Sequence, residues 1–336
     1  MKAINKVAAF LVCTSLLGTN CTADEISFLR GTDNICIKGT TEENSVSIVV
    51  KNNDGFYAAL YEAEADENGE FSAEFKLGET LGSGTYTASA FANGIESNFK
   101  LRYINEKEAA PVFIKLEKAD NFNEFKNILL SDGDKVGLSQ NDQVFVNETL
   151  YVSLKNKRLN SKVFLSELIG TEIIYNISKE NSKEALNMLS VNAVFLEINE
   201  NDFFKLATKK RENILEQLNK LSGFTSFKEL FDEASFLGLV NTASGRDELR
   251  EIVENTANFT GINLSDFKKL KYPENVLVVL MNKFDGYSSS MEFKKKFDSE
   301  VLAQQKKEQK KNESSSSGGG TNSGGGGIIS EETHPS

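Results

Sequence analysis

A long-range repeat is the feature of this chain that most limits how it can fold. The dipeptide Asn-Lys recurs at two successive intervals of 63 residues, at 156–157, 219–220 and 282–283. Just ahead of it, Glu212–Leu215 matches Glu274–Leu277, and Glu148–Tyr151 is a weaker third copy. Self-similarity at a fixed long period is typical of repeat units, each built as one supersecondary structure. We therefore predict an all-α region over 106–311 that contains three helical repeats of about 63 residues, with units at about 119–178, 181–240 and 244–303.

Helix-start signals divide each unit into three short helices. The first helix of each unit opens with a Ser or Asn followed three residues later by an acid, at Asn121–Glu124, Asn181–Glu184 and Ser244–Asp247. The third helix opens in the same way at Ser226–Glu229 and Ser289–Glu292. In such a pair the first side chain accepts an unpaired N–H, and the acid faces the positive end of the helix.

The residues before 106 follow a different period. Apolar and polar residues alternate in Phe71–Phe75 and in Gly84–Phe91, as in half-buried strands. Turn signals at Asn52–Gly55 and Asp66–Gly69 separate these segments. About seven short strands of this kind indicate an all-β immunoglobulin-like sandwich over residues 24–105.

One segment of this β region carries a resemblance. Asp66-x-Asn68-Gly69-x-Phe71, with Ser83–Thr87 further on, resembles the immunoglobulin-like modules of Gram-positive surface proteins. The resemblance implies that Tyr86 is a core or corner residue and not a catalytic one. Asp66, Asn68 and Glu70 have oxygens that suit calcium, but a turn explains the same three residues more simply.

The helical region also resembles a known group. Its Leu249-x-x-Ile252-x-x-Asn255 pattern and the Gly/Ser-rich segment that follows the helices are similar to those of clostridial cell-surface proteins that carry S-layer homology domains. In that group the S-layer homology domains bind wall polymer, and none lies in this chain. The resemblance therefore implies attachment to cell-wall polymer or surface-layer components through a module beyond residue 336.

The first residues predict export. Lys2 and Lys6 precede the apolar run Val7–Leu17, and small residues follow up to Ala23, as in a secretory signal peptide over 1–23. The alternative is a lipoprotein modified at Cys21. We predict an extracellular location, at the cell surface or cell wall. In the mature chain Cys36 is the single cysteine, and its apolar neighbours indicate a buried residue more than a reactive thiol.

Composition excludes several classes of function. The chain has 38 Lys and Arg against 49 Asp and Glu, a net charge of −11, whereas nucleic-acid binding needs a basic surface. The single histidine is His334, in the tail, so the region expected to fold has no His-based triad or zinc site. No catalytic residue, cofactor or metal ligand is predicted. Asp142, Asp202 and Asp266 occupy corresponding places in the three units, where helix capping is favoured over a shared ligand site.

The end of the chain and the function leave alternatives open. A Ser/Gly-rich disordered linker is predicted over 312–336, after a helix with the lysine run Lys294–Lys296. The first hypothesis is a non-enzymatic surface protein that serves display, spacing or wall interaction, with no transmembrane segment in the mature chain. The second is a carbohydrate-binding or adhesion module that uses Tyr57, Tyr61 and Phe91, and the third is a carboxylate-dependent polysaccharide hydrolase. The ligand, the oligomeric state and the choice between a solenoid and a single bundle stay open at this point.

Overall fold

The computed structural model describes residues 8–10, 28–29 and 34–316, except 79, 93–94, 194–195, 199–202, 204 and 284. The chain forms two compact units, residues 1–239 and 240–336. In the described part of the first unit, strands precede helices. The strands are β1 (Ala8–Phe10), β2 (Phe28–Leu29), β3 (Asn34–Thr40), β4 (Ser45–Asn52), β5 (Tyr57–Glu64), β6 (Glu70–Lys76), β7 (Gly84–Ala92) and β8 (Ile95–Tyr103).

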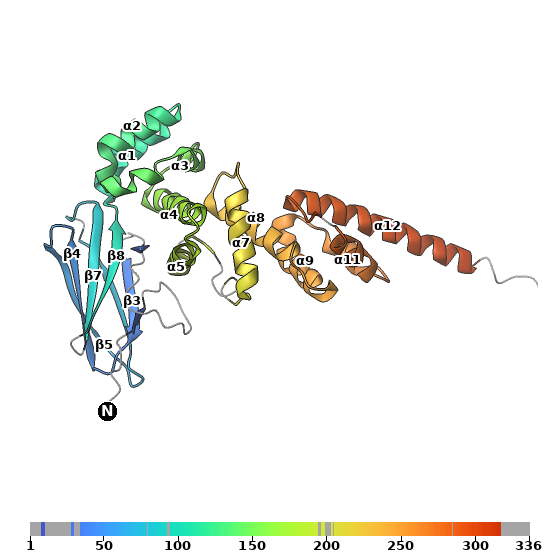
Figure 1. Ribbon diagram of the computed structural model, residues 1–336, viewed down its shortest axis with the longest axis horizontal. Helices are drawn as coiled ribbons and strands as arrows, with labels where there is room; N and C mark the ends of the chain where they lie inside the picture. Colours follow the sequence, from blue (N-terminus) through green and yellow to red (C-terminus); the bar gives the residue numbers. More distant parts are fainter. Residues whose placement is uncertain are drawn as a thin grey trace, which may run out of the picture. The chain divides into compact units, whose positions relative to one another are not determined.

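An antiparallel sheet of four strands, in the order β5-β4-β7-β8, is the centre of the β region (Figure 1). The short β2 adds to β8 in parallel, and β3 pairs separately with β1 and β6. One face of the sheet is buried, because alternate residues of β4 (Val46, Ile48 and Val50) have no exposed surface. Tyr86 and Phe71 belong to the same apolar core. The prediction that Tyr86 is a core residue is confirmed, and its hydroxyl donates to the Gly82 carbonyl over 2.6 Å.

The prediction of an immunoglobulin-like sandwich is wrong. In the described chain, β4, β5, β7 and β8, within residues 45–103, form the small four-stranded antiparallel sheet, a helical region follows, and no immunoglobulin-like sandwich is evident. Alternation identifies a strand, but it does not say which strands share a sheet or what covers the sheet. Here helices cover part of it: Arg102, at the end of β8, is buried against Asp142 and Glu172 of the helical region.

The helices begin directly after β8, where Asn105 caps α1 by accepting the Lys107 N–H. In the first unit they are α1 (Glu106–Glu117), α2 (Phe122–Asp132), η1 (Gly133–Val136), η2 (Gln140–Phe145), α3 (Glu148–Leu154), α4 (Ser161–Ser178), α5 (Ser182–Asn192), α7 (Thr208–Lys220) and α8 (Phe227–Val240). In the second unit they are α9 (Arg246–Thr260), α10 (Leu264–Lys268), α11 (Glu274–Met281) and α12 (Ser290–Ser316). In the described chain, three longer helices fall in each of the expected units: α2, α3 and α4, then α5, α7 and α8, then α9, α11 and α12. The short helices η1, η2 and α10 lie between them.

Several expected helix starts are confirmed. Asn121 accepts the Glu124 N–H at the start of α2. Ser226 and Ser289 accept the N–H groups of Glu229 and Glu292 at the starts of α8 and α12. Two starts differ. Asn181 makes no side-chain cap on α5, and α9 begins one residue later than expected, with Ser244 donating to Glu248 in place of Asp247.

Each unit has its own helical core. In the first unit the buried apolar residues of the helices from Ala109 to Ala234 form one cluster, which includes the ring pair Phe113–Phe164. In the second unit Phe267 packs on Phe297 with ring centroids 5.3 Å apart, and Tyr287 packs on Phe293 at 4.8 Å. The aromatic residues of the helical region that are buried therefore serve packing.

Some sequence expectations fall outside the described residues. The expected leader is described only at Ala8–Phe10, which pairs with β3, and Cys21 is not described. The tail from residue 317 on, including His334, is likewise not described. Among the helices that are described, none combines the length and the apolar character that a bilayer crossing requires.

Candidate functional site

The side of the sheet opposite the apolar core is the first candidate surface. Residues that pair directly across strands lie on the same face of a sheet. Val49 pairs with Leu60 on one side and Ser89 on the other, and Ser89 pairs with Asn98. We call this side the outer face, and the part of it considered below consists of Ser47, Val49, Lys51, Tyr57, Leu60, Glu62, Glu64, Thr87, Ser89, Phe91, Glu96, Asn98 and Lys100.

A β-bulge decides the direction of Tyr57. The register between β4 and β5 shifts between Val50 and Lys51, so Tyr57 pairs with Lys51 on the outer face. The Lys51 ammonium lies 5.0 Å from the centroid of the Tyr57 ring, a cation–π contact. Tyr61 instead pairs with Ile48, whose side chain belongs to the buried face.

The three aromatic residues expected to stack on a sugar are therefore divided. Phe91 pairs with Ser47, so it shares the outer face with Tyr57. Tyr61 lies on the other side of β5. Sequence reasoning missed this difference because a simple alternation places Tyr57 and Tyr61 on the same face.

The edge of the outer face is unusually apolar. β5 is the last strand of its sheet, and Tyr57 and Leu60 are 74% and 75% exposed. Phe56, in the turn before β5, is 71% exposed. Large apolar side chains gathered on an exposed edge are typical of contact surfaces.

The carboxylates considered as ligands have local partners. Asp66 accepts the N–H groups of Asn68 and Glu70, as the turn interpretation expects. Asp266 accepts from the Asn263 side chain at the start of α10. Asp202 is outside the described residues. No group of three His, Cys, Asp or Glu residues in the described ranges could hold a metal ion.

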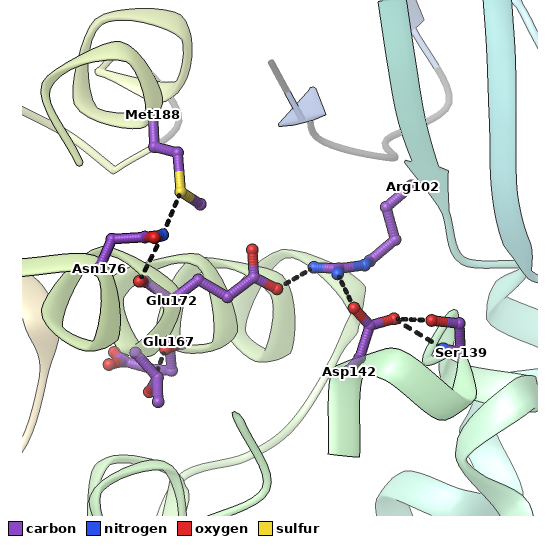
Figure 2. A network of polar contacts seen from close by, with 8 residues as sticks. Arg102, Ser139, Asp142, Glu167, Glu172, Asn176 and Met188 are labelled. Carbon is purple, nitrogen blue, oxygen red and sulfur yellow. Dashed lines mark hydrogen bonds and ion pairs between the residues drawn. The ribbon is translucent and has the colours of Figure 1, made fainter. Parts of the chain in front are cut away.

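Asp142 belongs to a buried ionic network that the sequence did not reveal (Figure 2). Its Oδ2 accepts from the Ser139 N–H and hydroxyl at 2.7 and 2.8 Å, which confirms a capping role. Its Oδ1 lies 3.0 Å from Nη2 of Arg102, and Nη1 of Arg102 lies 2.7 Å from Oε1 of Glu172. Asn176, one turn after Glu172, donates to the Glu172 backbone carbonyl. One arginine thus joins β8, η2 and α4.

In this network, burial and the neighbouring charges shift the pKa of each group in opposite directions. Burial lowers the pKa of Arg102, but Glu172 and Asp142 outweigh it and the pKa lies above its usual value. Burial raises the pKa of Glu172 and exceeds the opposite effect of Arg102. Because Arg102, Asp142 and Glu172 are only 1%, 6% and 2% exposed, the network holds elements together and is closed to a substrate.

Two signals in the sequence point to this network. Arg102 is a charged residue between Leu101 and Tyr103 at the end of a strand, and Glu172 is a charged residue in the otherwise uncharged segment Leu168–Ile174. Buried charges are rare unless they are paired, so each charge indicates a partner. Which partner each one has depends on contacts across 40 and 70 residues of sequence.

A cavity of about 410 Å³ between α3, α4 and the segment before α8 is a second candidate. Its wall includes Glu167, which is 5% exposed. Oε1 of Glu167 accepts from Lys157 at 2.8 Å, and Oε2 accepts the Phe227 N–H at 2.9 Å. Since both carboxylate oxygens are engaged, Glu167 serves to fix the start of α8.

No protein-family model matches the chain, and no curated protein matches it. The outer face and its β5 edge therefore rest on geometry alone as the candidate site.

Proposed function

We propose that this protein is a non-enzymatic, exported bacterial surface protein that displays a surface for contact with cells or cell-wall components and spaces it from the cell that exports it. The observation that carries the proposal is the exposed apolar edge of the outer face, at Phe56, Tyr57 and Leu60. The leader-like segment 1–23 and the Ser/Gly-rich tail support export and attachment. In this proposal the helical region acts as the spacer.

A cell-binding assay tests this function. The full chain is incubated with Gram-positive cells and with purified walls, and the pelleted fraction is measured. We expect retention that falls severalfold in a Tyr57→Ser/Leu60→Ser variant. The matched control is Val278→Ser/Leu302→Ser, which changes exposed apolar residues of α11 and α12. Equal retention of all three chains, or none, would contradict the proposal.

Carbohydrate binding is the second candidate, because Tyr57 and Phe91 share the outer face. Aromatic rings are the usual platforms for sugar rings, although this chain has no Trp. A glycan array probed with the full chain tests it. Binding that is lost in Tyr57→Ala and in Phe91→Ala but kept in Tyr61→Ala would support the outer face as the platform, and a blank array would count against it.

A further inference from the structure

The exposed edge of β5 lacks the features that usually keep strand edges apart. Proteins protect an edge strand with lysine, proline or inward-pointing charge, since its backbone can pair with another chain. The segment Phe56–Tyr61 contains no charged residue and no proline. Its exposed side chains Phe56, Tyr57 and Leu60 are large and apolar. Such an edge favours the addition of another strand.

The charges on β5 are distributed unequally along its length. Glu62 and Glu64 lie on the outer face at the end of the strand, and both are exposed. At the beginning of the strand, the Lys51 ammonium lies over the Tyr57 ring. One cation, Lys51 of β4, therefore lies beside the beginning of β5, the middle of the strand around Leu60 is apolar, and two acidic residues lie at its end.

We propose that β5 pairs antiparallel with β5 of a second copy of this chain, about a two-fold axis near Leu60. A two-fold axis brings the same patch of both copies together and reverses the strand direction. Glu62 and Glu64 of each copy then lie beside the Lys51–Tyr57 end of the other. Each opposite-charge contact forms twice, and the two Leu60 side chains meet at the centre. The β5 edge of one copy thus matches the β5 edge of the other in both charge and apolar character.

This pairing joins two four-stranded sheets into one continuous sheet. Because directly paired residues share a face, the two outer faces lie on the same side of it. The inference deepens, and rests on, the proposed contact function of the β region, since it names a second copy as the partner. Phe91, on the neighbouring part of the outer face, stays outside the strand pair.

Sedimentation equilibrium of the full chain, from micromolar to millimolar concentration, tests the pairing. We expect a monomer–dimer equilibrium in the wild type and monomer alone for Leu60→Asp. Because the Leu60 side chain is 75% exposed, this change leaves the fold intact, and circular dichroism verifies that. A wild type that stays monomeric, or a Leu60→Asp variant that dimerises as well as the wild type, overturns the proposal.

Charge reversal tests the antiparallel arrangement without touching the apolar centre. Lys51→Glu and Glu64→Lys should each weaken the dimer on the order of tenfold, because each change replaces an opposite-charge contact by a like-charge contact and the contact occurs twice. The double variant Lys51→Glu/Glu64→Lys should recover the wild-type dissociation constant. Matched controls are Lys295→Glu and Glu251→Lys, exposed residues of α12 and α9, which should have no effect. Two weakened single variants with no recovery in the double variant overturn the antiparallel register.

The outcomes separate this inference from the proposed function. A chain that dimerises through β5 but fails to bind cells or walls keeps the pairing and refutes the wall-contact role. A chain that binds walls but stays monomeric refutes the pairing and keeps the wall-contact role. The third outcome is a monomeric wild type that binds the glycan array, with a Tyr57→Ala variant that no longer binds it. In that case the edge is a carbohydrate site and the pairing is wrong.

Discussion

Arg102 is the residue whose surroundings most clearly decide its role. Removing it leaves Asp142 and Glu172 buried without their cation. We expect Arg102→Met to lower the free energy of unfolding by about 3–5 kcal/mol, measured by urea denaturation near pH 7. The loss should shrink as the pH falls, because burial raises the pKa of Glu172 and its protonation removes a buried charge.

A matched pair on the surface provides the control for Arg102. Lys162 and Glu197 form an ion pair whose side chains are 58% and 64% exposed. Lys162→Met should change the free energy of unfolding by less than about 1 kcal/mol. If Arg102→Met also costs less than that, the network is not the structural link described above.

Glu292 is a second residue with a testable titration. Hydrogen bonds from Lys283, and from the backbone and hydroxyl of Ser288, lower its pKa from 4.5 to about 2. Since the folded pKa lies below the unfolded one, the stabilisation is present above pH 4.5 and is lost as the pH falls through about 2. Carboxyl NMR titration of the chain should show this value, and Lys283→Met should raise it. An ordinary pKa for Glu292 in the wild type would contradict the capping geometry.

At the scale of elements, the contact between α4 and α8 depends on a missing side chain. A Cβ added at Gly170 would lie 2.3–2.6 Å from the Phe227 ring and its Cβ. Gly170→Ala should therefore destabilise the protein by about 1–3 kcal/mol, although alanine by itself favours a helix by about 1 kcal/mol.

A second glycine provides the comparison for Gly170. The nearest atom to a Cβ at Gly78 is the Thr80 hydroxyl oxygen at 3.7 Å, an ordinary contact. Thermal unfolding of Gly78→Ala should match the wild type within about 0.5 kcal/mol. A stabilised Gly170→Ala protein would show that α8 can move away from α4 at little cost.

Capping shows what local sequence determines at this scale. Asn121, Ser226 and Ser289 cap the helices that their patterns predicted, because a cap involves residues only three positions apart. Asn181 and Ser244 follow the same pattern but make different contacts. The local pattern therefore predicts approximately where a helix begins, and packing determines which polar group makes the capping hydrogen bond.

At the scale of the whole molecule, the two compact units should unfold separately. The ring pairs Phe267–Phe297 and Tyr287–Phe293 lie entirely within residues 240–316. We expect a fragment of these residues to be helical and to melt cooperatively by circular dichroism. Phe297→Ala should destabilise it by about 3–5 kcal/mol, because Phe297 is buried in its core. A fragment without a melting transition would contradict two independent units.

Calorimetry of the full chain extends this test. We expect more than one transition, since multidomain chains rarely unfold in a single step. Arg102→Met should lower only the transition of the unit that contains the sheet. A common shift of both transitions would show that the units unfold together.

The sequence alone is sufficient to predict the features that depend on near neighbours. It located the alternating strands, the change to helices just after Tyr103, the buried Tyr86 and most helix starts, because periodicity and capping act over a few residues. The prediction of a sandwich, which was based on the same alternation, is wrong. Alternation leaves open which strands pair and what covers their faces, and both are contacts between distant segments.

The parts of the molecule on which the proposed function depends follow from contacts in the folded chain and not from any local pattern. Arg102 reaches Glu172 across 70 residues, and no local pattern specifies that pairing. The direction of Tyr57 depends on a bulge opposite Lys51, which reverses what alternation predicts. Leu60 is an ordinary strand residue in the sequence, and it is exposed because β5 is the last strand of its sheet. Whether an apolar side chain is core or contact surface is set by its neighbours in space.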